Sequence, residues 1–161
     1  MDERMVVKRE HFYKSNLKWT GNLGKGTKNY SGYSRDYDIN INLKRPIEGS
    51  SDPSFLGNPQ RYNPEELLVA SVSSCHMLWY LHLCCQQHIV VINYEDNALG
   101  KMLENNDGSG CFESINLFPE VQVQEEQMIQ PAIRIHQIAN EMCFIANSLN
   151  FEVTHEPKVY L

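Results

Sequence analysis

The chain has 161 residues, of which 42% are hydrophobic and 21% charged, as is ordinary for a folded globular protein. Its net charge of −6 argues against nucleic-acid binding, because that affinity rests on basic surfaces. The length suits one domain spanning residues 1–161, with enough chain to bury a hydrophobic core.

The expected compartment is the cytoplasm. The start of the chain, MDERMVVKRE, lacks the apolar stretch of a secretory signal. The longest apolar run is interrupted by Ser, His and Gln, so no membrane partner is expected. In a reducing compartment, the five cysteines indicate free thiols, a redox pair or a metal site rather than structural disulfides.

The first part of the chain is predicted to be rich in strands. Loose alternation over residues 6–23 predicts one or two strands, and the Gly- and Asn-rich residues 21–33 predict turns. Clean alternation over 35–43 predicts the clearest strand. Residues 44–62 are predicted to be a long polar loop, of a kind that often covers a functional site.

The segment NPEELLVASVSSCHMLWYLHLCC, residues 63–85, is the most informative. Asn63 is expected to cap a helix that begins at Pro64, with an acidic pair in its first turn. The helix is apolar around nearly its whole circumference, which predicts that it is buried. Cys75 lies near its centre.

Strands are predicted again after this helix. Residues 89–94 are a β-branched run that 98–103 continues or pairs with. The turn 105–110 and a strand over 112–124 predict a hairpin.

A second helix is predicted over residues 131–149, and the tail 151–161 is predicted to be a short strand. This element order predicts an α+β fold with helices on one side of antiparallel sheets.

Two cysteine motifs carry a resemblance to a known family. NPEELL, followed by a Ser- and Ala-rich stretch and Cys75, resembles the first motif of the osmotically inducible protein C and organic hydroperoxide resistance family. EMCFIANSLNFEV, with Cys143 early in the second helix, resembles the second motif. Family members commonly have proline after the second cysteine, where this chain has Phe144.

The resemblance implies an OsmC-like α+β fold: antiparallel sheets, a long buried central helix, a second helix and an intertwined homodimer. It implies a thiol peroxidase that reduces organic hydroperoxides in oxidative stress defence, with a dithiol reductant as partner and no cofactor. Cys75 matches the cysteine that attacks the peroxide, Cys143 the resolving cysteine, and Glu65 the acid that orients an activating arginine.

Three cations are candidates for the activating group. Arg35, at the head of the clean strand, is the first choice and Arg61, just before the helix, the second. Lys25 is the third and replaces the arginine of a Gly-Arg-x-Gly turn in the hydroperoxide-resistance branch. A cation is needed because burial raises the pKa of a thiol above its usual value of about 8.5, whereas attack on an O–O bond requires the thiolate.

The spacing of Glu65 and Cys75 adds a geometric constraint. They are ten positions apart, a rise of about 15 Å on a straight helix, so Glu65 cannot reach its own Cys75 unless the chain breaks near residues 71–74. If two such helices pack antiparallel about a two-fold axis near Ala70, Glu65 of one copy meets Cys75 of the other. The sequence therefore predicts composite sites in a homodimer.

Other residues are predicted to be structural. Cys84, Cys85 and Cys111 are expected in the core, and His76 is expected to be a core or supporting histidine. No metal site is predicted, because no Cys or His pair has zinc-ligand spacing. Two other functions stay open: a non-peroxidase that binds a small apolar or electrophilic ligand in the dimer cleft, and a structural dimer with inert thiols.

Overall fold

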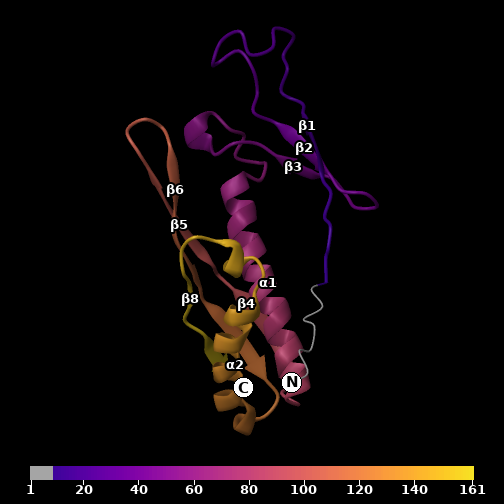
Figure 1. Cartoon of the computed structure of the whole chain (residues 1–161), viewed down its shortest axis with the longest axis vertical. Helices are drawn as coiled ribbons and strands as arrows, with labels where there is room; N and C mark the ends of the chain where they lie inside the picture. Colours follow the sequence, from indigo (N-terminus) through magenta and orange to yellow (C-terminus); the bar gives the residue numbers. More distant parts are fainter. Residues whose placement is uncertain (1–8) are drawn as a thin grey trace, which may run out of the picture. The chain divides into compact units, whose positions relative to one another are not determined.

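The computed structural model describes residues 9–161 (Figure 1). They form two compact units, the first ending at Pro64 and the second comprising Glu65–Leu161. That residues 1–161 act as one domain stays a prediction of the sequence. Residues 6–8 of the first predicted strand lie outside the described part.

The first unit is a three-stranded antiparallel sheet with long connections. Its elements are β1 (Asn16–Trp19), β2 (Tyr37–Asn40), β3 (Ile47–Gly49) and a 3-10 turn, η1 (Pro53–Phe55). β2 lies within the predicted strand 35–43 but is shorter, because the chain turns at Leu43, which has a φ of 62°. β3 lies in the region predicted as a loop, so this strand was missed.

The second unit holds both helices and two three-stranded sheets, ordered β4-β7-β9 and β5-β6-β8. Its helices are α1 (Pro64–Gln86) and α2 (Ile129–Met142), with 3-10 turns η2 (Glu126–Met128) and η3 (Ala146–Ser148). Its strands are β4 (Val91–Asp96), β5 (Leu99–Glu104), β6 (Gly110–Leu117), β7 (Pro119–Val123), β8 (Val153–His155) and β9 (Lys158–Tyr160). The predicted α+β class is confirmed.

The strands differ from the prediction in number and direction. β5 and β6 form the predicted hairpin, but the predicted strand 112–124 is divided into β6 and β7. The tail contains two strands rather than one, and each runs parallel to its neighbour, β8 to β6 and β9 to β7. The sheets are therefore mixed, because the chain passes through α2 before it returns to them.

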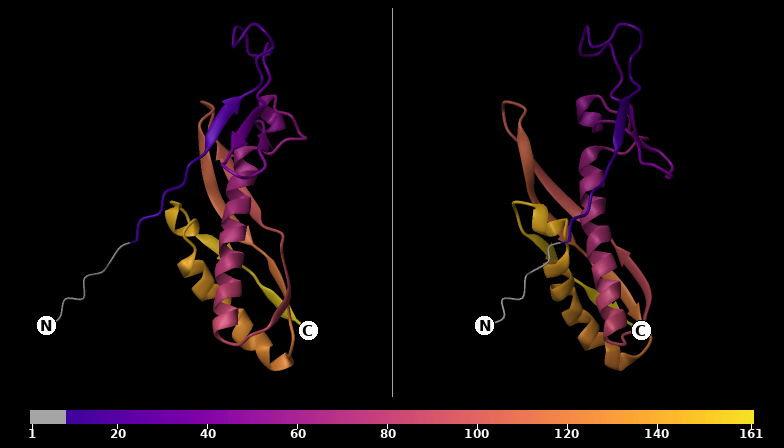
Figure 2. Two further views of the ribbon diagram at one scale, coloured as in Figure 1. Left: turned by 90° about the vertical axis from the view of Figure 1, so that its right-hand side faces the viewer. Right: turned by 45° about the vertical axis from the view of Figure 1, so that its right-hand side comes forward.

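Helix α1 buries one stripe rather than its whole circumference. Its fully buried residues, spaced four apart, are Val72, His76, Tyr80 and Cys84. The stripe spans two hydrophobic clusters, one with β6 and β8 and the other with β7 and α2. Figure 2 shows α2 beside the C-terminal half of α1 in both views. The prediction of a helix buried on all sides is thus wrong for the single chain, and Leu78 is 62% exposed.

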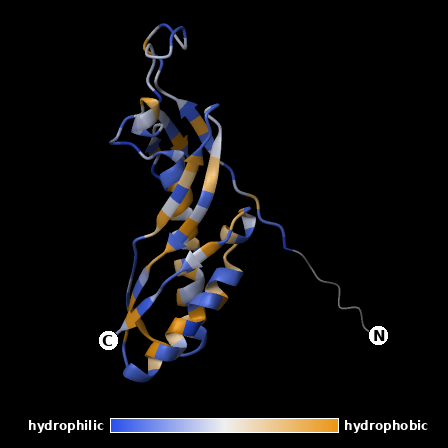
Figure 3. Cartoon of the chain, turned by 90° about the vertical axis from the view of Figure 1, so that its left-hand side faces the viewer, coloured by the Kyte–Doolittle hydropathy of each residue, from blue (hydrophilic) through white to orange (hydrophobic). Residues whose placement is uncertain are grey.

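The apolar residues of α1 also bear on whether this helix could cross a membrane. By length and composition, α1 is the one helix among residues 9–161 that could cross a membrane, a criterion that core helices of globular proteins also meet. Hydrophobic residues, orange in Figure 3, also recur along the strands of the same unit. The apolar character of α1 is therefore shared with the sheets on which it packs.

Candidate functional site

One face of α1 lines an open pocket of about 340 Å³. Cys75, Leu78, Trp79 and His82 contribute from the helix, because positions three, four and seven apart lie on the same side. Phe144, which follows α2, closes another side of the pocket. The lining is apolar apart from the Cys75 thiol and the His82 ring.

The rotation of α1 near Cys75 is fixed by a polar contact. Ser73 Oγ donates a hydrogen bond to Asp96 Oδ2 at the end of β4. The other carboxylate oxygen of Asp96 accepts the backbone N–H of Phe118 at 2.7 Å. Since Phe118 connects β6 to β7, one carboxylate holds the middle of the helix against both sheets of the second unit.

Cys143 lies directly after the end of α2, with extended backbone. Its Sγ accepts the backbone N–H of Ala146 at 3.4 Å, and its side chain is fully buried. Asn140, in the last turn of α2, donates to the carbonyl of Val153 at 3.0 Å and ties this end of the helix to β8. The expectation that Cys143 lies early in a helix is wrong, because α2 is shorter than predicted and ends at Met142.

The structure brings the two predicted cysteines together. Both are free thiols, and their side chains hydrogen-bond to each other. Burial, and next the hydrogen bond with Cys75, raise the pKa of Cys143 to about 11, although the N–H groups of Ala146 and Ile145 oppose this shift. Cys143 therefore keeps its proton at neutral pH, while Cys75 faces the pocket.

The other cysteines are divided between core and surface. Cys84 is buried as predicted, and this burial raises its pKa to about 11. Cys85 and Cys111 are exposed, so the prediction that they belong to the core is wrong. Cys85 follows the last buried position of α1, and Cys111 lies beside the exposed turn of the β5–β6 hairpin.

Glu65 is half-buried in the first turn of α1. The helix is continuous from Pro64 to Gln86, so the chain does not break between Glu65 and Cys75. Ten residues of unbroken helix separate them by about 15 Å, beyond the reach of a glutamate side chain. A role of Glu65 toward Cys75 of another copy stays a prediction.

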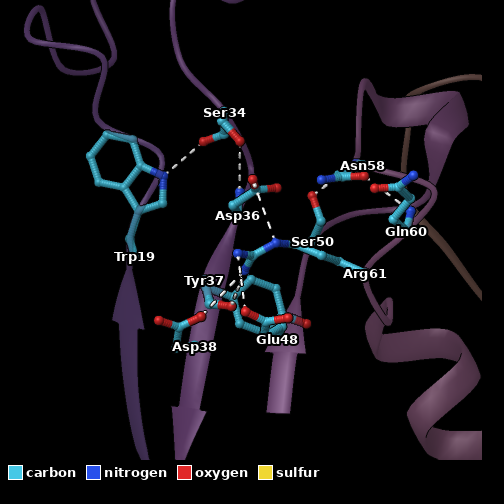
Figure 4. A network of polar contacts seen from close by, with 10 residues as sticks. All are labelled: Trp19, Ser34, Asp36, Tyr37, Asp38, Glu48, Ser50, Asn58, Gln60 and Arg61. Atoms are coloured by element: carbon cyan, nitrogen blue, oxygen red, sulfur yellow. Dashed lines mark hydrogen bonds and ion pairs between the residues drawn. The ribbon is translucent and has the colours of Figure 1, made fainter. Parts of the chain in front are cut away.

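All three candidate cations belong to the first unit, whereas Cys75 belongs to the second. Arg61 forms ion pairs with Asp36 at 3.6 Å, Asp38 at 3.3 Å and Glu48 at 3.7 Å, as Figure 4 shows. It therefore ties β2 and the residue before it to β3.

Arg35 is held differently. Its guanidinium lies over the rings of Tyr30 and Tyr33, 4.4 Å and 4.3 Å from their centroids. It donates to the backbone carbonyls of the same two residues at 2.6 Å and 2.7 Å. Lys25 lies in the exposed turn before them. The activation of Cys75 by any of these cations stays a prediction.

The sequence reasoning missed a cluster of three histidines, two of which are fully buried. His76 and His136 are fully buried, and their ring nitrogens Nε2 and Nδ1 lie 3.0 Å apart. His155 lies beside both, with ring centroids 5.6 Å and 6.0 Å away. Burial lowers the pKa of His76 to about 4 and of His136 to about 3, and it also lowers the pKa of His155. Within residues 9–161, no group of His, Cys, Asp and Glu is arranged to hold a metal ion.

Two pocket residues were also missed as site residues. The position of His82 is visible in the sequence, because it lies two helical turns from Cys75 on the same face. Phe144 was noted only as a departure from the second motif. Its place in the pocket depends on where α2 ends, which the sequence did not reveal.

Comparisons with known proteins agree with this architecture. An OsmC-like protein of unknown function from Vibrio cholerae is 30% identical, with a TM-score of 0.81, covering 92% of this chain and 100% of that one. An OsmC-like protein from Mycoplasma pneumoniae is 14% identical, with a TM-score of 0.70, covering 95% and 100%. An organic hydroperoxide resistance protein from Elizabethkingia anophelis is 18% identical, with a TM-score of 0.65, covering 93% and 100%. The last two similarities show a shared fold alone.

None of the curated proteins matches the sequence. The family model for OsmC-like proteins matches residues 57–158, more than half of the chain and a range that contains both Cys75 and Cys143. With the similarity to the Vibrio cholerae protein over nearly its whole length, the chain belongs to the family of OsmC-like proteins.

Proposed function

We propose that this chain is a cysteine-based peroxidase that reduces organic hydroperoxides in the cytoplasm. The observation that carries the proposal is the contact between Cys75, in an open apolar pocket, and the buried thiol of Cys143. The name of the structural neighbour from Elizabethkingia anophelis, an organic hydroperoxide resistance protein, supports the same activity.

In the proposed reaction, the Cys75 thiolate attacks one oxygen of the hydroperoxide. The S–O bond forms as the O–O bond breaks, and the leaving alkoxide takes up a proton to become the alcohol. Cys75 is thereby oxidised to a sulfenic acid. Cys143 then attacks that sulfur, so that a disulfide forms and water leaves. A dithiol reductant restores both thiols by exchange.

The difference in environment supports this division of roles. Cys143 is fully buried and holds its proton, so it is suited to react with the sulfenic acid of Cys75 rather than with the peroxide. Cys75 is the thiol that a hydroperoxide meets in the pocket. Since the pocket lining contains no arginine or lysine, the cation that favours the Cys75 thiolate must come from elsewhere.

We infer that the missing groups come with a second copy of the chain. Glu65 cannot reach its own Cys75, and no large hydrophobic side chain among residues 9–64 is buried. A sheet without a hydrophobic core needs a covering surface. In a homodimer, the partner would cover this sheet and supply Glu65 with one of the candidate cations, Arg35, Arg61 or Lys25.

The test of peroxidase activity is thiol titration and peptide mass spectrometry after brief treatment with one equivalent of tert-butyl hydroperoxide. The proposal expects rapid loss of two thiols and a disulfide between Cys75 and Cys143. Cys75→Ser should abolish the rapid reaction. Cys111→Ser is the matched control, because Cys111 is an exposed thiol outside the pocket. Slow oxidation spread over the exposed cysteines would contradict the proposal.

The second candidate function is ligand binding without peroxidase chemistry. It is favoured by the uncharged pocket lining, which suits a small apolar molecule without any need for a thiolate. The discriminating result would be saturable ligand binding that survives Cys75→Ser in a protein whose Cys75 reacts slowly with hydroperoxides.

A further inference from the structure

Phe144 is a large aromatic residue that takes no part in the hydrophobic clusters of the second unit. It is 70% exposed although it directly follows the fully buried Cys143. Its ring meets that of Trp79 edge to face, with centroids 5.6 Å apart and planes at 72°. The contact with Trp79 places the exposed Phe144 ring at the pocket. Its role therefore depends on the pocket and not on packing in the hydrophobic core.

The aromatic surface continues along α1. Trp79 also meets His82 nearly at a right angle, with ring centroids 5.7 Å apart and planes at 80°. Phe144, Trp79 and His82 thus form a row of rings, which we call the aromatic wall, beside the Cys75 thiol. Leu78 completes the lining.

Such a wall discriminates between ligands by ring geometry as well as by area. Aromatic rings prefer offset or edge-to-face neighbours, and each such pair favours a ring over an equally large saturated group by about two- to tenfold. A pocket of about 340 Å³ is within the range that holds small organic ligands. A phenyl group attached to the peroxide carbon therefore fits both the size and the chemistry of the site.

We propose that Phe144 and Trp79 select hydroperoxides that carry an aryl group on the peroxide carbon, with Phe144 as the specificity-determining residue. This inference rests on the proposed peroxidase function. The aryl ring lies against the aromatic wall, and the O–O bond points to Cys75.

The experiment uses three tertiary hydroperoxides whose peroxide carbon carries two methyl groups and one further group that varies. Cumene hydroperoxide carries a phenyl group, its cyclohexyl analogue a saturated ring of similar size, and tert-butyl hydroperoxide a methyl group. The second-order rate constant for oxidation of Cys75 is measured for each, and is divided by the rate constant of the same peroxide with a free small-molecule thiol. This division removes differences in intrinsic reactivity.

The expected result for the unmodified chain is a preference for the phenyl over the cyclohexyl compound. Phe144→Leu should lower that preference by about two- to tenfold. Phe144→Tyr keeps a ring and should keep the preference. Tyr160→Leu, which removes a partly exposed ring outside the pocket, is the matched control and should change nothing.

Failure of this inference is distinguishable from failure of the proposed function. Rapid oxidation of Cys75 with the same phenyl preference in Phe144→Leu overturns the role of Phe144 and leaves the peroxidase intact. If Cys75 reacts slowly with all three peroxides, the peroxidase proposal fails. Binding of the alcohol products then tests whether the aromatic wall selects aryl groups. Saturation-transfer NMR should show tighter binding of 2-phenyl-2-propanol than of its cyclohexyl analogue, and a loss of this difference in Phe144→Leu. Equal binding of the two alcohols would contradict the proposal that the aromatic wall selects aryl groups.

Discussion

At Cys143, burial and the hydrogen bond with Cys75 act in the same direction. Both raise the pKa of the Cys143 thiol, and a protonated thiol is a weak nucleophile. In the proposed reaction, Cys143 therefore does not attack the peroxide itself, although it lies next to the Cys75 sulfur that becomes oxidised. The roles proposed for the two cysteines thus differ because their surroundings differ, although their side chains are the same.

Replacing Cys143 by serine tests this assignment. In the Cys143→Ser variant, Cys75 should still react once with a hydroperoxide, but its sulfenic acid has no thiol partner nearby. Excess peroxide should then convert it to the sulfinic acid, and turnover should fall about a hundredfold or more, as expected when the thiol that rescues the sulfenic acid is lost. Mass spectrometry of the Cys75 peptide detects this product. Disulfide formation between Cys75 and another cysteine, with normal turnover, would show that Cys143 is dispensable.

The histidine cluster predicts loss of stability in acid. Burial lowers the pKa of His76 and His136 in the folded chain, so the unfolded chain binds more protons between pH 6.5 and about 4. The stability from keeping these rings neutral is complete above about pH 6.5 and is lost as the pH falls below it. At pH 5, each of the two histidines should lower the free energy of unfolding by about 2 kcal/mol.

The measurement is urea denaturation at a series of pH values. His136→Phe keeps a ring stacked on Tyr80, whose centroid lies 3.9 Å from that of His136, but removes one titrating group. The slope of the unfolding free energy against pH below pH 6.5 should fall by about one proton. His11→Gln, at an exposed position, is the control. An unchanged slope in His136→Phe would mean that His136 does not titrate on unfolding.

Sequence reasoning at the residue scale found the cysteines but not their surroundings. Cys75 and Cys143 could be singled out because each lies in a recognisable motif. The three clustered histidines come from α1, α2 and β8, and only tertiary packing brings them together. Cys111 was misplaced because its position beside a turn does not reveal that both faces of the hairpin end are exposed.

At the scale of elements, the approach of α1 to β5 depends on Gly100. A Cβ atom at this position would lie 2.5 Å from Val69 Cγ2 and 2.8 Å from Cε1 of Phe112. Gly100→Ala should therefore lower the free energy of unfolding by about 1–3 kcal/mol, because the helix or the Phe112 ring must shift. Thermal or urea denaturation measures the change.

Gly32→Ala is the matched control, because its nearest neighbour would lie 3.4 Å away, in ordinary van der Waals range. Its free energy of unfolding should change by less than about 1 kcal/mol. Equal effects of the two substitutions would mean that the packing of α1 on β5 does not limit stability.

The elements that could be predicted are those with strong local signals. The capped start of α1, the turn between β5 and β6 and the alternation around β2 are all readable from neighbouring residues. β3, β8 and β9 have three residues each, too few for a clear period, and β8 and β9 pair with strands that are distant in sequence. The parallel direction of β8 and β9 follows from the path through α2, which no local pattern encodes.

At the scale of the whole molecule, the first unit lacks buried large hydrophobic side chains among its described residues 9–64. Such a sheet is unlike an independent domain, which has its own core. The proposed homodimer accounts for this, and it makes the site composite, with Glu65 and Cys75 from different copies.

Co-expression of two variants tests the composite site. Glu65→Gln and Cys75→Ser chains with different tags are purified as a heterodimer, in which one site keeps both residues if Glu65 acts in trans. The heterodimer should show about half of the unmodified dimer's activity, whereas each homodimer should be nearly inactive, as two-fold symmetry requires. Absence of activity in the heterodimer, or a monomer that is fully active in sedimentation, would exclude the shared site.

The position of Trp79 also gives the chain an internal optical reporter. The chain has two tryptophans, and the other, Trp19, belongs to the first unit. With Trp19 replaced by phenylalanine, all indole emission would originate beside Cys75. Fluorescence intensity should then follow each change in the oxidation state of that sulfur in real time, without any added dye.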